Sequence, residues 1–106
     1  MPLCGGVGEE KTATEDVQSL VDSVRQDILS KLGSEPAQLR ATHYQSQVVA
    51  GTNYFIRVNL GHPDKHVHVR IYKHFSGSVA LHGVKHHEDG GVGLDVALEY
   101  FEQNVN

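Results

Sequence analysis

The chain has 106 residues, with thirteen acidic side chains against nine basic ones and a formal net charge of −4 at pH 7. This length is enough for a single domain, residues 1–106, built around one core. The acidic balance argues against nucleic acid as a partner. The first six residues lack the basic and apolar segments of a secretory signal, and no later stretch is long enough to span a membrane, so we expect a cytoplasmic protein without membrane contact.

The N-terminal third is predicted to hold a flexible lead and one long helix. Residues 1–11 are rich in glycine and are expected to form a flexible trunk, with ordered structure beginning at Thr12. The spacing from Thr12 to Glu15 is typical of a helix-capping box, although Thr14 could also serve as the cap. The helix should end at Gly33, and Pro36 supports this end because its ring disfavours helix in the preceding residue. Apolar side chains at spacings of three and four mark one face of about five helical turns: Val17, Leu20, Val21, Val24, Ile28 and Leu32.

From residue 39 onward the apolar period falls from 3.6 to 2, which predicts β-strands. In chain order we expect a strand over residues 40–50, a hairpin at 50–53, a strand over 54–60, a turn at 61–64, a strand with Val67, Val69 and Ile71 on one face, a turn at 76–78 and a strand over 79–85. One long N-terminal helix followed by such a meander predicts an α+β fold. The helix would then pack across one face of a twisted antiparallel β-sheet.

Neither the histidines nor the single cysteine indicates an enzyme. His66 and His68 share one face of a predicted strand, and two histidines at that spacing can begin a zinc site. No acidic or cysteine ligand repeats beside them, so a solvated polar face is the preferred interpretation and a zinc site the alternative. Cys4 lies in the glycine-rich lead, where no rigid element holds a base beside it. We therefore expect no catalytic residue, no metal and no cofactor.

The most informative segment is Gln47 to Gly51, an uncharged and mostly apolar pentapeptide at the predicted hairpin. An exposed hairpin tip normally carries Asn, Asp, Ser or Pro. An apolar tip therefore indicates either burial in the protein's own core or a surface that another molecule covers. Followed by Thr52-Asn53-Tyr54-Phe55, the segment resembles the inhibitory loop of the cystatins. Further landmarks of that family occur in the same order: Gly5-Gly6, the helix, a second loop and Tyr100-Phe101.

The resemblance implies a small inhibitor of papain-like cysteine proteases, such as cathepsins of the L, S, B or H type. Such an inhibitor binds reversibly and tightly, competes with substrate and performs no chemistry. In this family three stretches form a wedge that enters the active-site cleft. Matched to this chain, they are Leu3, Cys4, Gly5 and Gly6 in the trunk, Gln47, Val48, Val49, Ala50 and Gly51 in the first loop, and His74, Phe75 and Ser76 in the second loop.

The second loop and the cysteine count refine this resemblance. The stefins, the intracellular branch, usually carry Leu-Pro in the second loop, and this chain does not, so Phe75 is expected to supply the apolar contact. One cysteine cannot form an internal disulfide, whereas secreted cystatins carry paired cysteines, so the chain resembles the stefins more closely.

The resemblance also bears on the end of the chain and on assembly. It favours an extended segment over residues 92–101, although residues 96–101 would also form a helical turn. We expect a monomer that can form a domain-swapped dimer if the hairpin opens, because the valines of the tip suit a straight strand better than a turn. A non-inhibitory metal-binding or protein-interaction module on the same fold is the alternative function.

Overall fold

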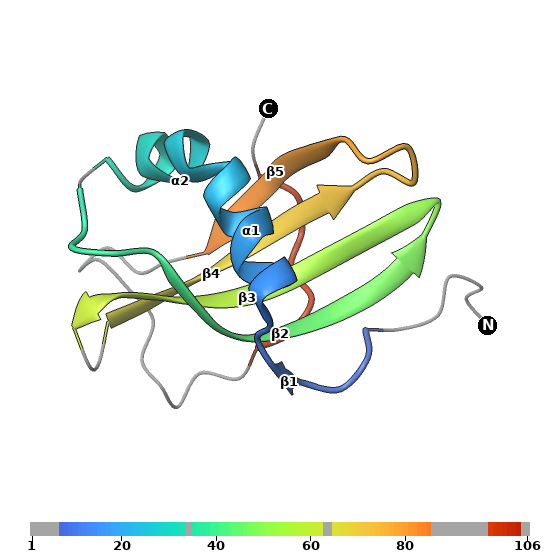
Figure 1. Cartoon of the computed structure of the whole chain (residues 1–106), viewed down its shortest axis with the longest axis horizontal. Coiled ribbons are helices and arrows are strands. Elements are labelled where there is room, and N and C mark those ends of the chain that lie inside the picture. Colours follow the sequence, from blue (N-terminus) through green and yellow to red (C-terminus); the bar gives the residue numbers. More distant parts are fainter. Residues whose placement is uncertain (1–6, 34, 63–64, 86–97, 105–106) are drawn as a thin grey trace.

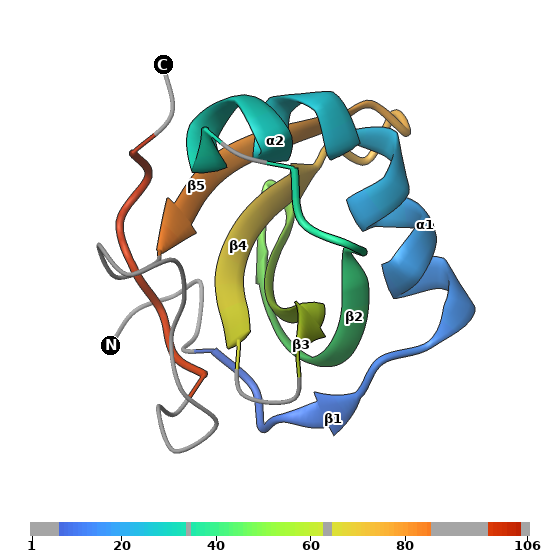
Figure 2. The ribbon, with the colours of Figure 1, turned by 90° about the vertical axis from the view of Figure 1, so that its left-hand side faces the viewer.

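The computed structural model describes residues 7–33, 35–62, 65–85 and 98–104, which form a five-stranded antiparallel sheet with two helices on one face (Figure 1). The strands lie in the sheet in chain order, from β1 to β5. The sheet curls around the helices, which occupy its concave side (Figure 2). The elements are β1 (Lys11–Thr12), α1 (Glu15–Ser23), α2 (Arg25–Leu32), β2 (Arg40–Val49), β3 (Gly51–His62), β4 (Lys65–Lys73) and β5 (Val79–Lys85). The predicted α+β class is confirmed.

The prediction of one long helix is wrong, because α1 and α2 are separate helices that meet at Val24. The backbone of Val24, at φ −117° and ψ 22°, leaves helical geometry, and its N–H donates to the carbonyl of Val21 at 3.2 Å. A continuous α-helix would bond this N–H to the carbonyl of Leu20, which instead accepts the hydroxyl of Ser23 at 2.8 Å. The side chain of Ser23 thus competes with the backbone where the helix breaks.

The helical region ends where the sequence predicted, at Gly33, and begins at the second of the two candidate caps. Thr14, rather than Thr12, is the N-cap, and its hydroxyl accepts the N–H of Val17 at 3.3 Å. Gly33 ends α2 at φ 71°, a left-handed conformation that glycine adopts without strain. Within the described ranges, no helix is long and apolar enough to cross a membrane.

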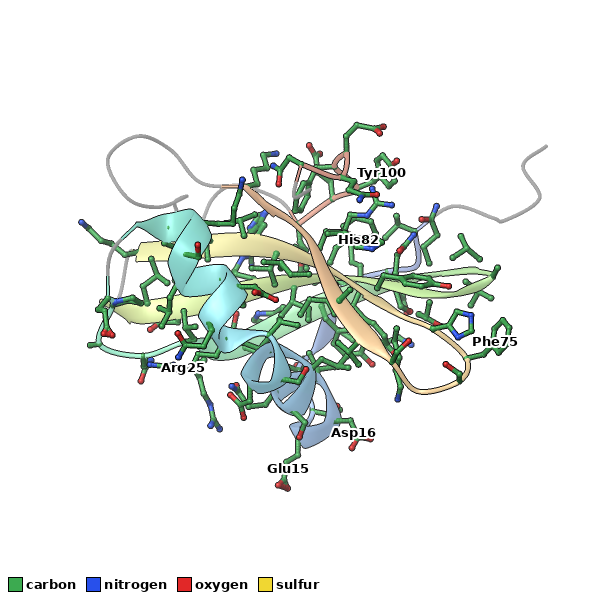
Figure 3. The ribbon with its side chains drawn as sticks, turned by 90° about the horizontal axis from the view of Figure 1, so that it is seen from above. Glu15, Asp16, Arg25, Phe75, His82 and Tyr100 are labelled. Atoms are coloured by element: carbon green, nitrogen blue, oxygen red, sulfur yellow. The ribbon has the colours of Figure 1, made fainter. Side chains whose placement is uncertain are left out.

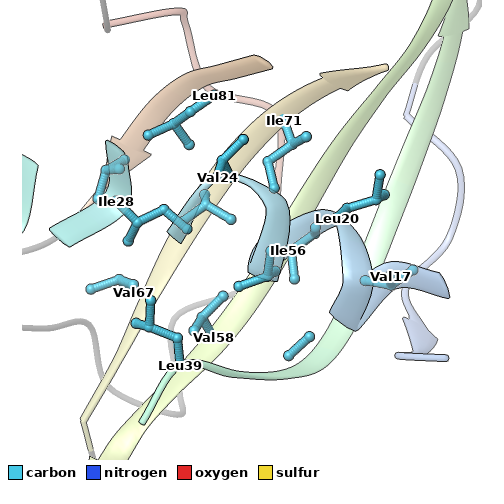
Figure 4. Close-up of a cluster of buried hydrophobic side chains, with 14 of the residues drawn as sticks. Val17, Leu20, Val24, Ile28, Leu39, Ile56, Val58, Val67, Ile71 and Leu81 are labelled. Atoms are coloured by element: carbon cyan, nitrogen blue, oxygen red, sulfur yellow. The ribbon is translucent and has the colours of Figure 1, made fainter. Parts of the chain in front are cut away.

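The apolar core fills the space between the helices and the sheet (Figure 4). The apolar stripe of the helices and the alternating side chains of the strands supply it, as predicted, and the break at Val24 leaves that stripe facing the sheet. Full burial of each large aliphatic side chain contributes roughly 1.5–3 kcal/mol to folding. The main members are Val17, Leu20, Val21, Val24, Ile28, Ile56, Val58, Leu60, Val67, Val69, Ile71, Leu81 and Val84.

The outer face of the sheet, away from the helices, differs from its prediction. The alternation indicated a solvated polar face around His66 and His68, and this is wrong because His66 is 3% exposed and His68 is fully buried. Phe55, on the same face, is also fully buried. The rings of Tyr100 and Phe101 lie 5.4 and 5.8 Å from the ring of Phe55. The outer face is therefore a second buried layer.

The C-terminal segment, residues 98–104, lies against this outer face (Figures 2 and 3). The carboxamide of Asn104 accepts the N–H of Val84 at 3.0 Å and donates to its carbonyl at 2.9 Å. The carbonyl of Phe101 accepts the guanidinium of Arg70 at 3.0 Å. Most of the segment that we expected to be extended, residues 92–101, lies outside the described residues. Its described part is not helical.

Candidate functional site

The loop between β2 and β3 and the loop between β4 and β5 lie at the same end of the sheet (Figures 1 and 3). The strand register explains this arrangement, because Thr52 at the start of β3 pairs with Lys73 at the end of β4. We call the first loop, Gln47 to Gly51, the tip. We call the second loop, residues 74–78, the β4–β5 loop. The structure thus brings together the two internal stretches that the sequence predicted as site residues.

The tip presents apolar side chains to solvent rather than to the core. Val48 is 71% exposed, Ala50 is exposed and Val49 is half-buried. The side chain of Asn53 donates to the Oε1 of Gln47 at 3.1 Å, which braces the two strands at the base of the tip. Of the two interpretations of this apolar segment, burial of Val48 in the protein's own core is therefore excluded.

The turn at the tip is shorter than the predicted hairpin over residues 50–53. Strand pairing continues until Val49 stands opposite Gly51, so Ala50 alone lies between the strands. Gly51 has φ 110°, which side chains rarely tolerate. A Cβ at this position would also lie 2.7 Å from the carbonyl oxygen of Lys73 and 2.6 Å from the hydroxyl of Tyr72. Glycine is required here by both conformation and space.

The β4–β5 loop is a closed turn that points Phe75 outward. The N–H of His74 donates to the carbonyl of Ser78 at 2.8 Å, and the N–H of Gly77 donates to the carbonyl of His74 at 2.8 Å. The Nδ1 of His74 accepts the N–H of Ser76 at 3.1 Å. Phe75 is 79% exposed and projects from the end of the loop (Figure 3). This large apolar side chain is thus exposed to solvent rather than packed in the core.

The trunk approaches the tip along β2. Leu3, Cys4, Gly5 and Gly6 lie outside the described residues, but β1 pairs Lys11 with Tyr44, and the N–H of Gly8 donates to the carbonyl of Ser46 at 2.9 Å. Contact with the sheet therefore begins before Thr12, where the sequence indicated that order starts. Moving from Thr12 back to Gly8, the chain follows β2 toward the tip.

The buried histidines of the outer face do not form a metal centre. Over the part of the chain that the structure describes, no group of three or more His, Cys, Asp or Glu side chains could hold a metal ion. Burial lowers the pKa of His68 to about 4, and the positive charges of Arg57, Lys85 and His66 act in the same direction. His68 is therefore neutral at physiological pH, in a setting that disfavours any added positive charge.

Sequence reasoning missed one residue of this site, Tyr72. Tyr72 lies on β4 and belongs to neither internal stretch that the resemblance implied, but its hydroxyl donates to the carbonyl of Ala50 in the tip. Its ring stacks on the ring of His82, with 5.3 Å between centroids and 14° between planes. No sequence signal connects these residues, because the contact depends on how the tip bends over β4.

Comparison with known proteins agrees with this geometry. A sequence profile described as the cystatin domain matches residues 5–88. Cystatin-A of Homo sapiens is 40% identical over 73 residues, which cover 69% of this chain and 74% of the relative. Cystatin-B of Oplegnathus fasciatus is 38% identical over 87 residues, 79% of this chain and 86% of the relative. Cystatin-A2 of Dictyostelium discoideum is 37% identical over 101 residues, 95% of this chain and 100% of the relative.

With a curled sheet around its helices, an apolar tip and a family profile that covers most of its length, the chain belongs to the cystatin family. Cystatins are protease inhibitors rather than enzymes, so the chain is not an enzyme. Its A- and B-type relatives place it in the stefin branch, as the resemblance indicated.

Proposed function

We propose that this chain is a reversible, tight-binding and competitive inhibitor of papain-like cysteine proteases, with cathepsins of the L, S, B or H type as its partners. The observation that carries the proposal is the 71% exposure of Val48 at an uncharged tip, beside a loop whose Phe75 is 79% exposed. A relative from Sus scrofa, leukocyte cysteine proteinase inhibitor 1, is 37% identical over 71 residues and supports this function.

The chemistry of the tip suits an occupant of a narrow apolar cleft. Burial of one valine side chain contributes on the order of 1.5–3 kcal/mol, and the tip carries no charge that would have to be desolvated. Binding by this edge competes with substrate because both occupy the cleft. Val48, Val49 and Phe75 supply contact area, whereas Gln47, Ala50 and Gly51 shape the turn that presents it.

The trunk is proposed to extend the same edge. Leu3 and Cys4 would contact the protease on the nonprime side, while Gly5 and Gly6 allow the two backbones to approach closely. The course of β1 and Gly8 toward the tip supports this role. Removal of residues 1–5 should weaken inhibition of papain, chiefly through a faster off-rate, without abolishing it. Equal affinity of the truncated and full chains would remove the trunk from the proposal.

The direct test places charge on the tip. The double variant Val48→Asp and Val49→Asp should weaken inhibition of papain by several kcal/mol, on the order of a thousandfold, because two carboxylates would be buried in the cleft. The inhibition constant is measured at fixed pH and salt, and the thermal midpoint reports whether the fold survives.

A charge-matched control separates contact from net charge. Gln26 and Ser30 are exposed on α2, at the other end of the sheet from the tip (Figure 1). Gln26→Glu with Ser30→Glu also adds two negative charges and should leave inhibition within about twofold, since distant exposed charges are screened by salt. Undiminished inhibition by a folded tip variant, or equal losses in both double variants, would overturn the proposed role of the tip.

A further inference from the structure

The two loops of the edge are connected through one side chain, Tyr72 of β4. Tyr72 lies one position before the end of its strand, paired with Asn53 of β3 on one side and Ala80 of β5 on the other. Its hydroxyl donates to the carbonyl of Ala50, the single residue that turns the tip. A residue of β4 therefore holds the backbone of the β2–β3 hairpin at its turn.

The ring of Tyr72 belongs to an aromatic row that continues into the β4–β5 loop. One face stacks on His82 of β5, and the ring meets the ring of His74 edge-on, with 6.2 Å between centroids and 69° between planes. The ring of His74 in turn lies 4.1 Å from the ring of Phe75. Burial and the charge of Arg70 lower the pKa of His82, which favours the neutral ring in this stack. The path from the tip to Phe75 is thus a continuous row of contacts.

Gly51 makes this contact possible. A Cβ at Gly51 would lie 2.6 Å from the hydroxyl oxygen and 2.8 Å from the ring carbon Cζ of Tyr72. The tip can rest on Tyr72 only because the residue after Ala50 has no side chain. The glycine and the tyrosine therefore form one unit, in which the missing side chain of Gly51 leaves room for the hydroxyl of Tyr72.

We propose that Tyr72 is a positioning residue that fixes the tip relative to the β4–β5 loop, so that Val48 and Phe75 meet the protease in one preset arrangement. This inference rests on the proposed function for its effect on inhibition. The physical gain is preorganisation: a tip bonded to β4 before binding loses less conformational freedom when it enters the cleft. Tyr72 itself need not touch the protease.

The first test examines the free protein and does not depend on inhibition. In Tyr72→Phe the ring can keep its stack on His82, but the hydrogen bond to Ala50 is lost. NMR should show a changed carbonyl shift of Ala50 and larger backbone motion from Val48 to Gly51, with the β4–β5 loop unchanged. Tyr54→Phe is the control, because it removes a tyrosine hydroxyl from the helix-facing side of the neighbouring strand and should leave the tip as in the wild type.

The second test measures coupling between the loops in inhibition of papain. Tyr72→Phe should weaken inhibition about three- to tenfold, as expected for one hydrogen bond, and Phe75→Ala about tenfold. In the variant that combines Tyr72→Phe with Phe75→Ala, the fold loss of inhibition should be smaller than the product of the two single losses. The reason is that the position of the tip matters less once the ring of Phe75 is absent. Tyr54→Phe combined with Phe75→Ala should show multiplying losses.

The outcomes separate this inference from the proposed function. An unchanged Ala50 resonance and unchanged tip motion in Tyr72→Phe would overturn the positioning role, and so would losses that simply multiply in an inhibitor that otherwise behaves as proposed. If the NMR changes occur as expected but the wild-type chain does not inhibit papain, the positioning of the tip stands and the proposed function fails.

Discussion

The two faces of the sheet are built by alternate residues of the same strands, yet they are buried in different ways. The concave face is covered by α1 and α2 and is aliphatic throughout its centre, with Ile56, Val69 and Ile71 fully buried. The outer face holds Phe55 and His68, both fully buried, together with charged neighbours. One face stabilises the fold by apolar burial alone, and the other combines apolar burial with titratable groups.

The difference teaches that a polar residue in an alternating strand is not necessarily a solvated one. On the outer face the guanidinium carbon of Arg70 lies 5.7 Å from the ring centre of Phe55 and 5.3 Å from that of Tyr100. Such cation–π contacts contribute about 0.5–2 kcal/mol each, and more when desolvated. Tyr100 and Phe101, from the C-terminal segment, cover the part of this face around Phe55. The polar side chains are tolerated there for two reasons: Arg70 has a hydrogen-bond partner, and His68 stays neutral.

The largest expected loss of stability follows from truncating Phe55 or Ile56, two neighbouring residues of β3 that point to opposite faces of the sheet. Phe55→Ala should lower the free energy of unfolding by about 3–5 kcal/mol, and Ile56→Ala by about 2–5 kcal/mol, because both side chains fill closed space. Urea unfolding measures both values. If an alanine variant does not fold, the smaller truncations Phe55→Leu and Ile56→Val take its place in the same measurement. A cost below about 1 kcal/mol for Phe55→Ala would show that the outer face is open to solvent, since exposed positions tolerate substitution.

The next effect distinguishes the faces by pH. Because the folded pKa of His68 is about 4 against an ordinary 6.5, the unfolded chain takes up the proton first as pH falls. The stability that depends on neutral His68 is present above pH 6.5 and is lost between pH 6.5 and about 4. From pH 7 to pH 5 this loss amounts to about 2 kcal/mol.

The measurement compares two variants by urea unfolding at pH 7, 6 and 5. His68→Gln removes the titrating group. The free energy of unfolding of this variant, relative to that of the wild type, should therefore rise by about 2 kcal/mol between pH 7 and pH 5. Ile56→Val, on the concave face, should cost about 0.5–1.5 kcal/mol at each pH, because it contains no ionisable group. If the free energy of unfolding changed with pH in the same way in wild type and His68→Gln, the lowered pKa of His68 would be contradicted. Two ion pairs, Arg57 with Glu10 and Lys85 with Glu99, each 3.6 Å apart, are common to both proteins.

The smallest expected effect concerns the covering segment itself. Asn104→Ala removes both hydrogen bonds to Val84 and should lower stability by about 1–2 kcal/mol, since each net hydrogen bond contributes about 0.5–1.5 kcal/mol. Amide exchange at Val84 should accelerate at the same time. Gln26→Ala, at an exposed position of α2, is the control and should change stability by less than about 0.5 kcal/mol. Unchanged exchange at Val84 would mean that residues 98–104 do not hold the outer edge of β5.

The sequence alone determined the parts of this protein that depend on local spacing. The apolar stripe from Val17 to Ile28, the stop at Gly33 and the alternation in β3 and β4 follow from helix and strand periods, and they were predicted correctly. The apolar tip from Gln47 to Gly51 was recognisable because an uncharged run is unusual at a hairpin. These features are local because each depends on the conformation of a few consecutive residues.

The tertiary structure decided what covers each face and what each exposed side chain meets. Periodicity shows which residues share a face but not whether that face is covered, so the full burial of Phe55 and His68 on the outer face was missed. The break at Val24 depends on which donor reaches the carbonyl of Leu20, and the hydrogen bond from Tyr72 to Ala50 depends on how one hairpin bends over its neighbouring strand. Such contacts join residues far apart in the chain or choose between competing donors, and only the packed fold selects among them.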